Sequence, residues 1–283
     1  MKNISTNRAY TFLITNGRGG VGKTNIAYAL AETSARLGYK TALVDCDRSE
    51  TLKRKLTRRR AWHANEERGV TDIPFTFLQC WFEDEIKGKK RKCREKLYST
   101  TAGFEVAVVD ISGELSRVQA NIAPITDFII MPMAPEMALV EFTMDSYVSL
   151  YSAIQDEEAL DGKEHPIITA VKSRWEKNTK TARACQSYID QEVKEYEYDV
   201  LKTTLNSYVT YNKAGHFGVS VLDTTEVGDS SDRKAAEQPV HEMKKLCKEV
   251  LVRAGLATPK MKRANDNPTV PIEGLVSPDC LAQ

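Results

Sequence analysis

Short apolar runs and helical stretches alternate along most of the chain. The first run, residues 10–15, precedes a glycine-rich segment and then residues 24–37, where apolar side chains recur at helical spacing. Gly38 suits the end of that helix, and residues 41–45 form a second apolar run. This order predicts two parallel strands joined by a helix with a right-handed crossover.

Later apolar runs predict further strands, at residues 75–78, 106–110, 128–132, 166–171 and 218–222. Helical stretches separate most of them, so we expect an α/β fold with a doubly wound, mostly parallel sheet and helices on both faces. Residues 234–254 have one apolar helical face, which favours a helix packed on the sheet over a membrane anchor. Prolines and few large apolar residues follow, so we expect a domain over residues 1–256 and a disordered tail over 257–283.

Composition narrows the class of protein. The chain has 283 residues, enough for one substantial domain, and a formal net charge of +1, which gives no global attraction to nucleic acid or to a membrane. The sequence holds no apolar run long enough to span a bilayer and no signal-peptide core at its start. Its six cysteines lack metal-binding spacing and favour free thiols. We therefore expect a cytoplasmic protein without a membrane partner.

The glycine-rich segment Gly17–Thr24 satisfies the pattern G-x-x-x-x-G-K-[ST], with a predicted strand before it and a helix after it. Glycines let backbone N–H groups turn inward around phosphate oxygens, and the helix start adds a positive dipole end. In such a loop Lys23 neutralises the β- and γ-phosphates, and the Thr24 hydroxyl is a Mg²⁺ ligand. The segment therefore predicts binding of ATP with Mg²⁺. The predicted nucleotide-binding residues are Gly17, Arg18, Gly19, Gly20, Val21, Gly22, Lys23, Thr24 and Asn25.

The fuller segment Asn16–Asn25 resembles the deviant Walker A loop of the ParA/MinD family of ATPases, which usually contains Lys-Gly-Gly-x-Gly-Lys-Thr. Arg18 stands at the position of the family's signature lysine. In the family that cation reaches across a nucleotide-sandwich dimer to the partner's phosphates, so the resemblance implies a catalytic role for Arg18. Arginine keeps the charge but has a different shape, and the alternative is a solvated loop residue.

The segment Leu43–Ser49 resembles the family's second motif, apolar-apolar-Asp-x-Asp-Pro-Gln. By position, Asp47 corresponds to the catalytic carboxylate that orients the attacking water and reaches the Mg²⁺ shell. The end of a parallel strand beside the phosphate loop is a suitable place for that group. Arg48 and Ser49 replace the family's Pro-Gln, and Asp47 as a turn or helix-capping residue is the alternative.

Residues 105–110 resemble a Walker B strand, which implies that Asp110 holds the Mg²⁺ through water. The family continues with Pro-Pro, whereas this chain has Ile111-Ser112-Gly113-Glu114. Residues 129–136 resemble the family strand that ends in Pro-x-x-Pro-Glu. Residues 201–222 are similar to the late segment that closes over the adenine and ends in a Gly-x-x-Val-Leu strand. The resemblance thus extends over residues 10–255.

Two basic clusters, residues 48–60 and 87–96, suggest a non-specific grip on the phosphate backbone of DNA. Their alternative is a pair of solvated helical faces balanced by acids elsewhere. The late segment at residues 206–212 lacks the arginines that chromosome-type ParA proteins use on DNA, so that site does not carry over.

The resemblance implies an ATPase whose ATP-bound form dimerises and whose hydrolysis is stimulated by a protein partner. Such proteins act in plasmid or DNA partition, in positioning, or in conjugative transfer. Turnover without the partner should be slow, because no evident catalytic glutamate follows Asp110.

Other functions stay open on the same fold. A metabolic ATP-dependent ligase or amidase needs a small-molecule pocket, for which the sequence shows no motif. An iron–sulfur reductase needs cysteines shortly after the Asp110 strand, and Cys93 and Cys185 are misplaced for that. The last alternative is a scaffold that binds ATP with little turnover.

Overall fold

The computed structural model describes residues 8–47, 49–63, 73–82, 90–111, 116–155 and 165–257. Within them, parallel strands form one sheet in the order β3-β2-β4-β1-β5-β6. The strands are β1 (Tyr10–Ile14), β2 (Thr41–Asp45), β3 (Thr76–Gln79), β4 (Val106–Asp110), β5 (Phe128–Met133) and β6 (Ile167–Lys172). The α-helices are α1 (Lys23–Arg36), α2 (Thr51–His63), α3 (Lys90–Thr101), α4 (Ser116–Ile122), α5 (Met137–Gln155), α6 (Lys180–Tyr196), α7 (Val209–Phe217) and α8 (Ser230–Arg253). Two 3₁₀ turns, η3 (Ala123–Ile125) and η4 (Val221–Asp223), complete the described elements.

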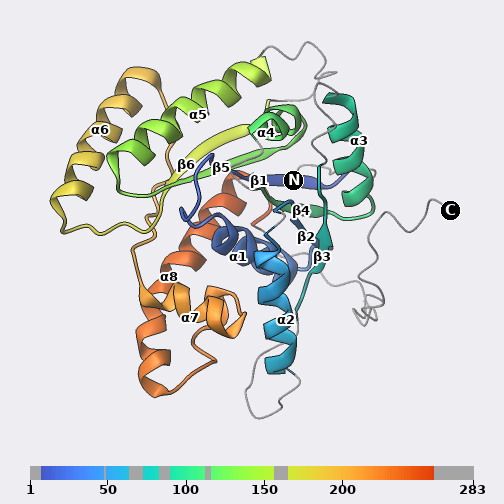
Figure 1. Cartoon of the computed structure of the whole chain (residues 1–283), viewed down its shortest axis with the longest axis vertical. Coiled ribbons are helices and arrows are strands. Elements are labelled where there is room, and N and C mark those ends of the chain that lie inside the picture. The colour runs from blue at the N-terminus through green and yellow to red at the C-terminus, as the bar shows by residue number, and fades with distance from the viewer. Residues whose placement is uncertain are drawn as a thin grey trace.

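Helices cover both faces of the sheet (Figure 1). Successive strand residues point to opposite faces, so Phe12 and Ile14 pack with α1, α2 and α8, whereas Leu13 packs with α3, α4 and α5. Helix α6 packs on α5 beyond the β6 edge. This is the predicted doubly wound α/β fold, and strands β1 to β6 lie within one or two residues of their predicted bounds.

The carboxyl ends of the central strands meet in register. Ile14 lies opposite Asp110, which in turn lies opposite Asp45 on β2. The loop between β1 and α1 starts at this edge. Parallel strands place ligand sites outside their carboxyl ends, so this edge positions the candidate site.

The predicted strand at residues 218–222 is wrong. Gly218 ends α7 in the left-handed region, at φ 74°, and a Cβ there would collide with the backbone carbonyl of Lys55. The Ser220 hydroxyl then accepts a hydrogen bond from the Leu222 N–H at 3.2 Å and starts η4. Local glycine and serine chemistry thus outweighs the apolar composition, and Val221 and Leu222 pack into the core as part of a turn.

Helix α8 starts at Ser230, four residues before its predicted start, because Asp229 caps it by accepting from the Asp232 N–H at 2.9 Å. None of the helices described here combines the length and apolarity that crossing a membrane requires. Cys46, Cys80, Cys93, Cys185 and Cys247 are buried free thiols. The predicted tail lies outside the described residues apart from Ala257.

Candidate nucleotide-binding site

The loop between β1 and α1 depends on glycine at three positions. Gly20 and Gly22 have φ of +73° and +97°, values that L side chains rarely adopt. A Cβ at Gly22 would lie 3.2 Å from the Ser173 hydroxyl, and one at Gly17 would collide with the Phe142 ring. The backbone therefore forms a cradle free of side chains at the start of α1, as a phosphate group requires.

Asn16 anchors the start of this loop. Its buried amide nitrogen donates to the Pro132 carbonyl at 2.7 Å and to the Thr143 hydroxyl at 2.8 Å. Its side-chain oxygen accepts from the Arg18 N–H at 2.9 Å. The loop is thereby fixed to the end of β5 and to α5.

A second anchor comes from the end of β6. The buried Ser173 hydroxyl donates to the Val21 carbonyl, and the Arg174 guanidinium donates to the Gly20 carbonyl at 2.8 Å. Arg174 itself has φ 55°, in the left-handed region. Ser173 and Arg174 carry no sequence signal for this role, because no local pattern links them to a loop about 150 residues earlier.

Lys23 extends back across the loop. Its ammonium donates to the Asn16 carbonyl at 3.1 Å and to the Arg18 carbonyl at 2.6 Å. Burial lowers its pKa, and the charges of Asp110 and Asp47 oppose that shift. The cation is thus held at the glycine cradle, where it can bind a phosphate oxygen.

Two buried carboxyl groups lie beside the loop. The Thr24 hydroxyl hydrogen-bonds to Asp110, whose pKa burial raises to about 6. Burial raises the pKa of Asp45 to about 7, with Asp110 and Asp47 adding to the shift. The buried Oδ2 atom of Asp45 has no hydrogen-bond partner among the described residues. A cation shell at this position would satisfy that oxygen.

Asp47 forms the predicted turn and lies near the phosphate loop. Its Oδ1 atom accepts from the Ser49 N–H at 2.8 Å, which forms a turn, and its own N–H donates to Asp45 at 3.0 Å. Its charge also acts on Lys23 and Asp110, so it lies at the same edge of the sheet. Arg48 lies outside the described residues.

The described part of the chain contains no preassembled group of three or more metal-binding side chains. Mg²⁺ usually keeps several waters and is held by one or two protein groups together with substrate phosphates. Thr24, Asp47 and Asp110 are the residues that would hold it. Asp45, which the sequence analysis did not single out as a site residue, adds a fourth oxygen-bearing side chain nearby.

Arg18 is exposed on the outer side of the loop. Its guanidinium lies 4.6 Å from the centroid of the Phe142 ring on α5, a cation–π contact. The side chain is therefore neither folded into the cradle nor fully solvated. It is available to groups outside the monomer.

The first basic cluster, residues 48–60, is divided between the surface and the interior, and this corrects its interpretation as one charged face. Arg54, Arg58 and Arg60 are exposed, but Lys55 and Arg59 are only 8% and 0% exposed. Arg59 pairs with Glu32 at 3.3 Å and with Asp223 at 2.8 Å, and Lys55 donates to the Asn25 side chain at 2.7 Å. These two inward cations cannot contact DNA. In the second cluster, Lys92, Arg94 and Lys96 are described, with Arg94 donating to the Asn121 carbonyl at 3.0 Å, and the side chains of residues 87–91 lie outside the description.

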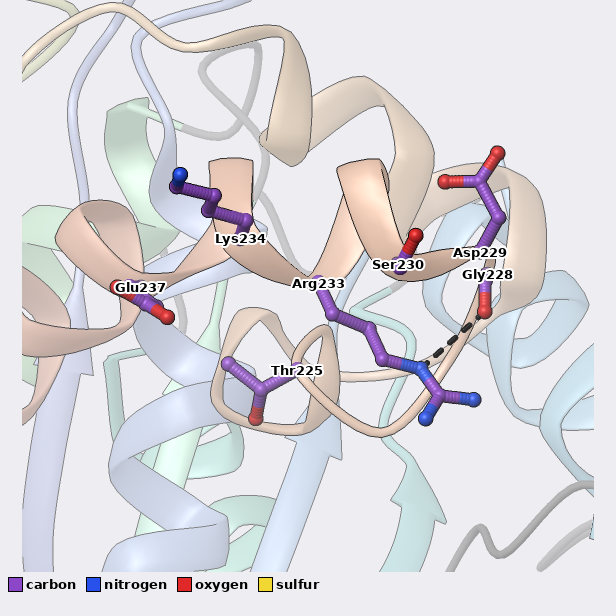
Figure 2. Close-up of a pocket in the computed structure, with 7 residues that line it drawn as sticks. All are labelled: Thr225, Gly228, Asp229, Ser230, Arg233, Lys234 and Glu237. Carbon is purple, nitrogen blue, oxygen red and sulfur yellow. Dashed lines mark hydrogen bonds between the residues drawn. The ribbon is translucent and has the colours of Figure 1, made fainter.

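A separate pocket of about 530 Å³ lies where α8 begins (Figure 2). Its walls carry both charge signs, and Arg233 there donates to the Gly228 carbonyl at 3.2 Å. Its lining residues are Thr225, Gly228, Asp229, Ser230, Arg233, Lys234 and Glu237. None of them belongs to the Gly17–Thr24 loop, so the loop cradle remains the candidate site on chemical grounds.

Known structures with this fold include nucleotide-bound examples. ParA of pNOB8 superposes with a TM-score of 0.61 at 13% identity, covering 87% of this chain and 99% of that one. MinD of Pyrococcus horikoshii, solved with Mg-ADP, gives 0.58 at 17% identity and covers 88% and 98% of the two chains. A variant of McdA from Cyanothece, solved in complex with ATP, gives 0.55 at 13% identity and covers 84% and 97%.

Sequence comparison gives a short match to a known protein and identifies the protein family. The septum site-determining protein MinD of Mesostigma viride is 57% identical over 37 residues, which is 13% of this chain and 13% of that protein. The chain thus matches about an eighth of the length of that curated relative. Residues 12–221 match the CobQ/CobB/MinD/ParA nucleotide-binding domain. With this match over most of its length, the chain belongs to the CobQ/CobB/MinD/ParA nucleotide-binding family.

Proposed function

We propose that the protein is an ATP-dependent switch of the ParA/MinD type, which dimerises with Mg²⁺ and ATP bound and separates after hydrolysis. The observation that carries this proposal is the arrangement at the loop. Lys23 and Thr24 lie at the cradle beside Asp110, while Arg18 faces outward against Phe142. Exposed Arg18, at the position of the family's signature cation, supports an interface in which it reaches the phosphates of a second subunit.

The proposed reaction transfers the terminal phosphoryl group of ATP to water. The water oxygen bonds to the γ-phosphorus as the bond to the β-phosphate oxygen breaks, and the products are ADP and phosphate. Asp47 orients the water, Lys23 binds the phosphate oxygens, and Arg18 adds charge from the second subunit. Mg²⁺, when bound through Thr24, Asp47 and Asp110, neutralises charge on the phosphates. Turnover is slow until a partner protein stimulates it.

The cellular role that we propose is partition or positioning of DNA, a plasmid or another cargo, with conjugative transfer as one setting. The similarity to ParA, MinD and McdA supports this class. Exposed Arg54, Arg58 and Arg60 on α2, with the described cations of α3, offer weak, salt-sensitive contacts for non-specific DNA. We place the protein in the cytoplasm, with residues 1–256 as the ATPase domain and 257–283 as a tail.

Sedimentation velocity tests the proposal. The wild type is run with ADP and with ATP, and a Lys23→Ala variant is run with ATP. We expect ATP to double the mass of the wild type and to leave the variant monomeric. Duplex DNA added at low and at high salt should co-sediment with the ATP form at low salt.

A wild type that binds ATP and stays monomeric would rule out the sandwich dimer. The metabolic ligase or amidase and the ATP-binding scaffold would then be the better hypotheses, and product analysis with ATP and candidate acids would separate the two. If the protein forms an ATP-dependent dimer that does not bind DNA at low salt, the proposed switch stands and the proposed DNA binding is refuted.

A further inference from the structure

The side chain of Lys55 on α2 contacts the start of α1. Lys55 is 8% exposed, and its ammonium donates to the side-chain oxygen of Asn25 at 2.7 Å. Asn25 directly follows Thr24 in the first turn of α1. A Cβ built on Gly215 of α7 would lie 3.7 Å from the Lys55 Cε atom. The lysine head group therefore lies where α1, α2 and α7 meet, beside the phosphate loop.

Within the described part of the chain Lys55 has no carboxylate in ion-pair contact, and Asp110 acts on it only from a longer distance. Its hydrogen-bond partner is a neutral amide. Arg59, one turn later on the same face of α2, is paired with both Glu32 and Asp223. The same helix thus buries one cation with its counter-charges and one without.

A buried cation without an anion is costly, because water solvates an ammonium far better than an amide does. Burial lowers the pKa of Lys55 to about 8, the charge of Asp110 raises it, and that of Arg58 lowers it further. The fold would be at least as stable with an apolar side chain at this place. Retaining a lysine here makes sense if an anion binds beside it.

We propose that Lys55 is a phosphate-binding residue of the nucleotide site, supplied by α2 rather than by the Gly17–Thr24 loop. The proposal rests on the proposed function, since the anion is a phosphate group of the bound nucleotide. Asn25 holds the ammonium at the first turn of α1, where backbone N–H groups and the helix dipole already favour negative charge. Lys55 adds a full positive charge from α2, in addition to that of Lys23.

The test separates a phosphate-binding role of Lys55 from a structural one, because the two roles predict opposite changes in the stability of the nucleotide-free protein. Lys55→Met keeps the length and the apolar stem of the side chain and removes the charge. We expect ATP affinity, measured with Mg²⁺ and a fluorescent ATP analogue, to fall roughly ten- to a hundredfold. The urea midpoint of the nucleotide-free protein should stay unchanged or rise, because an unpaired buried charge is gone.

Lys244→Met is the matched control, since Lys244 is an exposed lysine on α8 that has no role in the proposed nucleotide or DNA sites. Its ATP affinity should stay within about twofold of the wild type. Lys55→Gln serves if the methionine variant does not fold, because glutamine can still donate to Asn25 while carrying no charge. It should lose affinity in the same way.

Unchanged ATP affinity in Lys55→Met would overturn the inference. So would a loss of affinity accompanied by a lower urea midpoint, which would identify Lys55 as a structural link between α1 and α2. A wild type that binds no ATP would instead refute the proposed function itself, and this result is independent of the variants.

Discussion

Asp45 and Asp110 occupy the same register position on the neighbouring parallel strands β2 and β4. Both side chains are buried, and burial raises the pKa of each. The carboxyl edge of the sheet therefore holds negative charge that the protein alone does not fully compensate. Lys23 and a bound Mg²⁺ are the groups that can balance it directly, and Lys55 acts on Asp110 only through its longer-range charge.

This pairing predicts a pH dependence of stability. The pKa of Asp45 is about 7 in the fold and about 3.9 in the unfolded chain. Between those values the unfolded chain releases a proton that the folded chain keeps, so stability falls as pH rises from about 4 to 7. Asp45→Asn removes this loss and still accepts from the Asp47 N–H. Without Mg²⁺ the variant should be more stable than the wild type at pH 8 by about 2–4 kcal/mol, and similar to it at about pH 4.

Urea unfolding across that pH range checks this prediction. A difference between variant and wild type that stays constant with pH would contradict it. Repeating the series with Mg²⁺ and ATP should reduce the advantage of the variant, because the cation stabilises the ionised carboxylate.

Two glycines of the loop should respond differently to alanine. Gly17→Ala places a methyl group on the Phe142 ring and should lower stability by about 1–3 kcal/mol. A Cβ built on Gly19 would meet no heavy atom of the described residues within 4 Å, so Gly19→Ala should fold normally and act on nucleotide binding alone. Thermal unfolding and ATP binding are measured for both. A second change, Phe142→Leu, should restore stability to Gly17→Ala, and failure to do so would show that the ring is not the obstacle.

Arg18 should contribute to formation of the ATP-dependent dimer and little to the affinity of one subunit for ATP. It is exposed and contacts the Phe142 ring rather than the cradle. Arg18→Ala should keep ATP affinity within about threefold of the wild type while losing the ATP-dependent dimer. Arg18→Lys should restore part of the dimer, because charge is kept. Sedimentation and binding together decide this, and a fully dimeric Arg18→Ala would assign the side chain to the loop surface.

The buried ion pairs of Arg59 with Glu32 and Asp223 should stabilise the fold only while both signs of charge are present. Arg59→Met leaves Glu32 and Asp223 without that partner in the interior and should cost about 3–5 kcal/mol of stability. Arg60→Met, on the exposed side of α2, should change stability by less than about 0.5 kcal/mol. Urea denaturation of the two variants gives the comparison. Equal effects would mean that the pairs contribute nothing beyond surface charge.

Strands β1 to β6, the phosphate loop and the position of Asp110 could be predicted from the sequence because each depends on short-range patterns. Apolar runs define buried strands, and the spacing from Gly17 to Thr24 lies within one loop. Residues 218–222 show where this fails. Their apolar content suits a strand, but Gly218 and Ser220 end one helix and start a turn before pairing can occur.

The supports of the site were harder to predict, because they join distant parts of the chain. Ser173 and Arg174 contact the loop from the end of β6, and nothing in their neighbourhood marks them. The buried face of α2, in contrast, can be predicted from the spacing of its residues. Leu52, Leu56 and Arg59 recur at i, i+4 and i+7, so this spacing places one arginine on the apolar face and not with the exposed basic residues.

The burial of Arg59 helps to fix the position of α2 against α1 and η4. Leu52 and Leu56 are the main apolar residues that this helix is known to bury, so apolar contacts alone define its alignment weakly. Sliding the helix by one turn would bring Lys55 to the carboxylates of Glu32 and Asp223 and would leave the guanidinium unmatched. The charge pairs therefore select a single alignment of α2. That alignment also places the Lys55 ammonium against Asn25 in the first turn of α1.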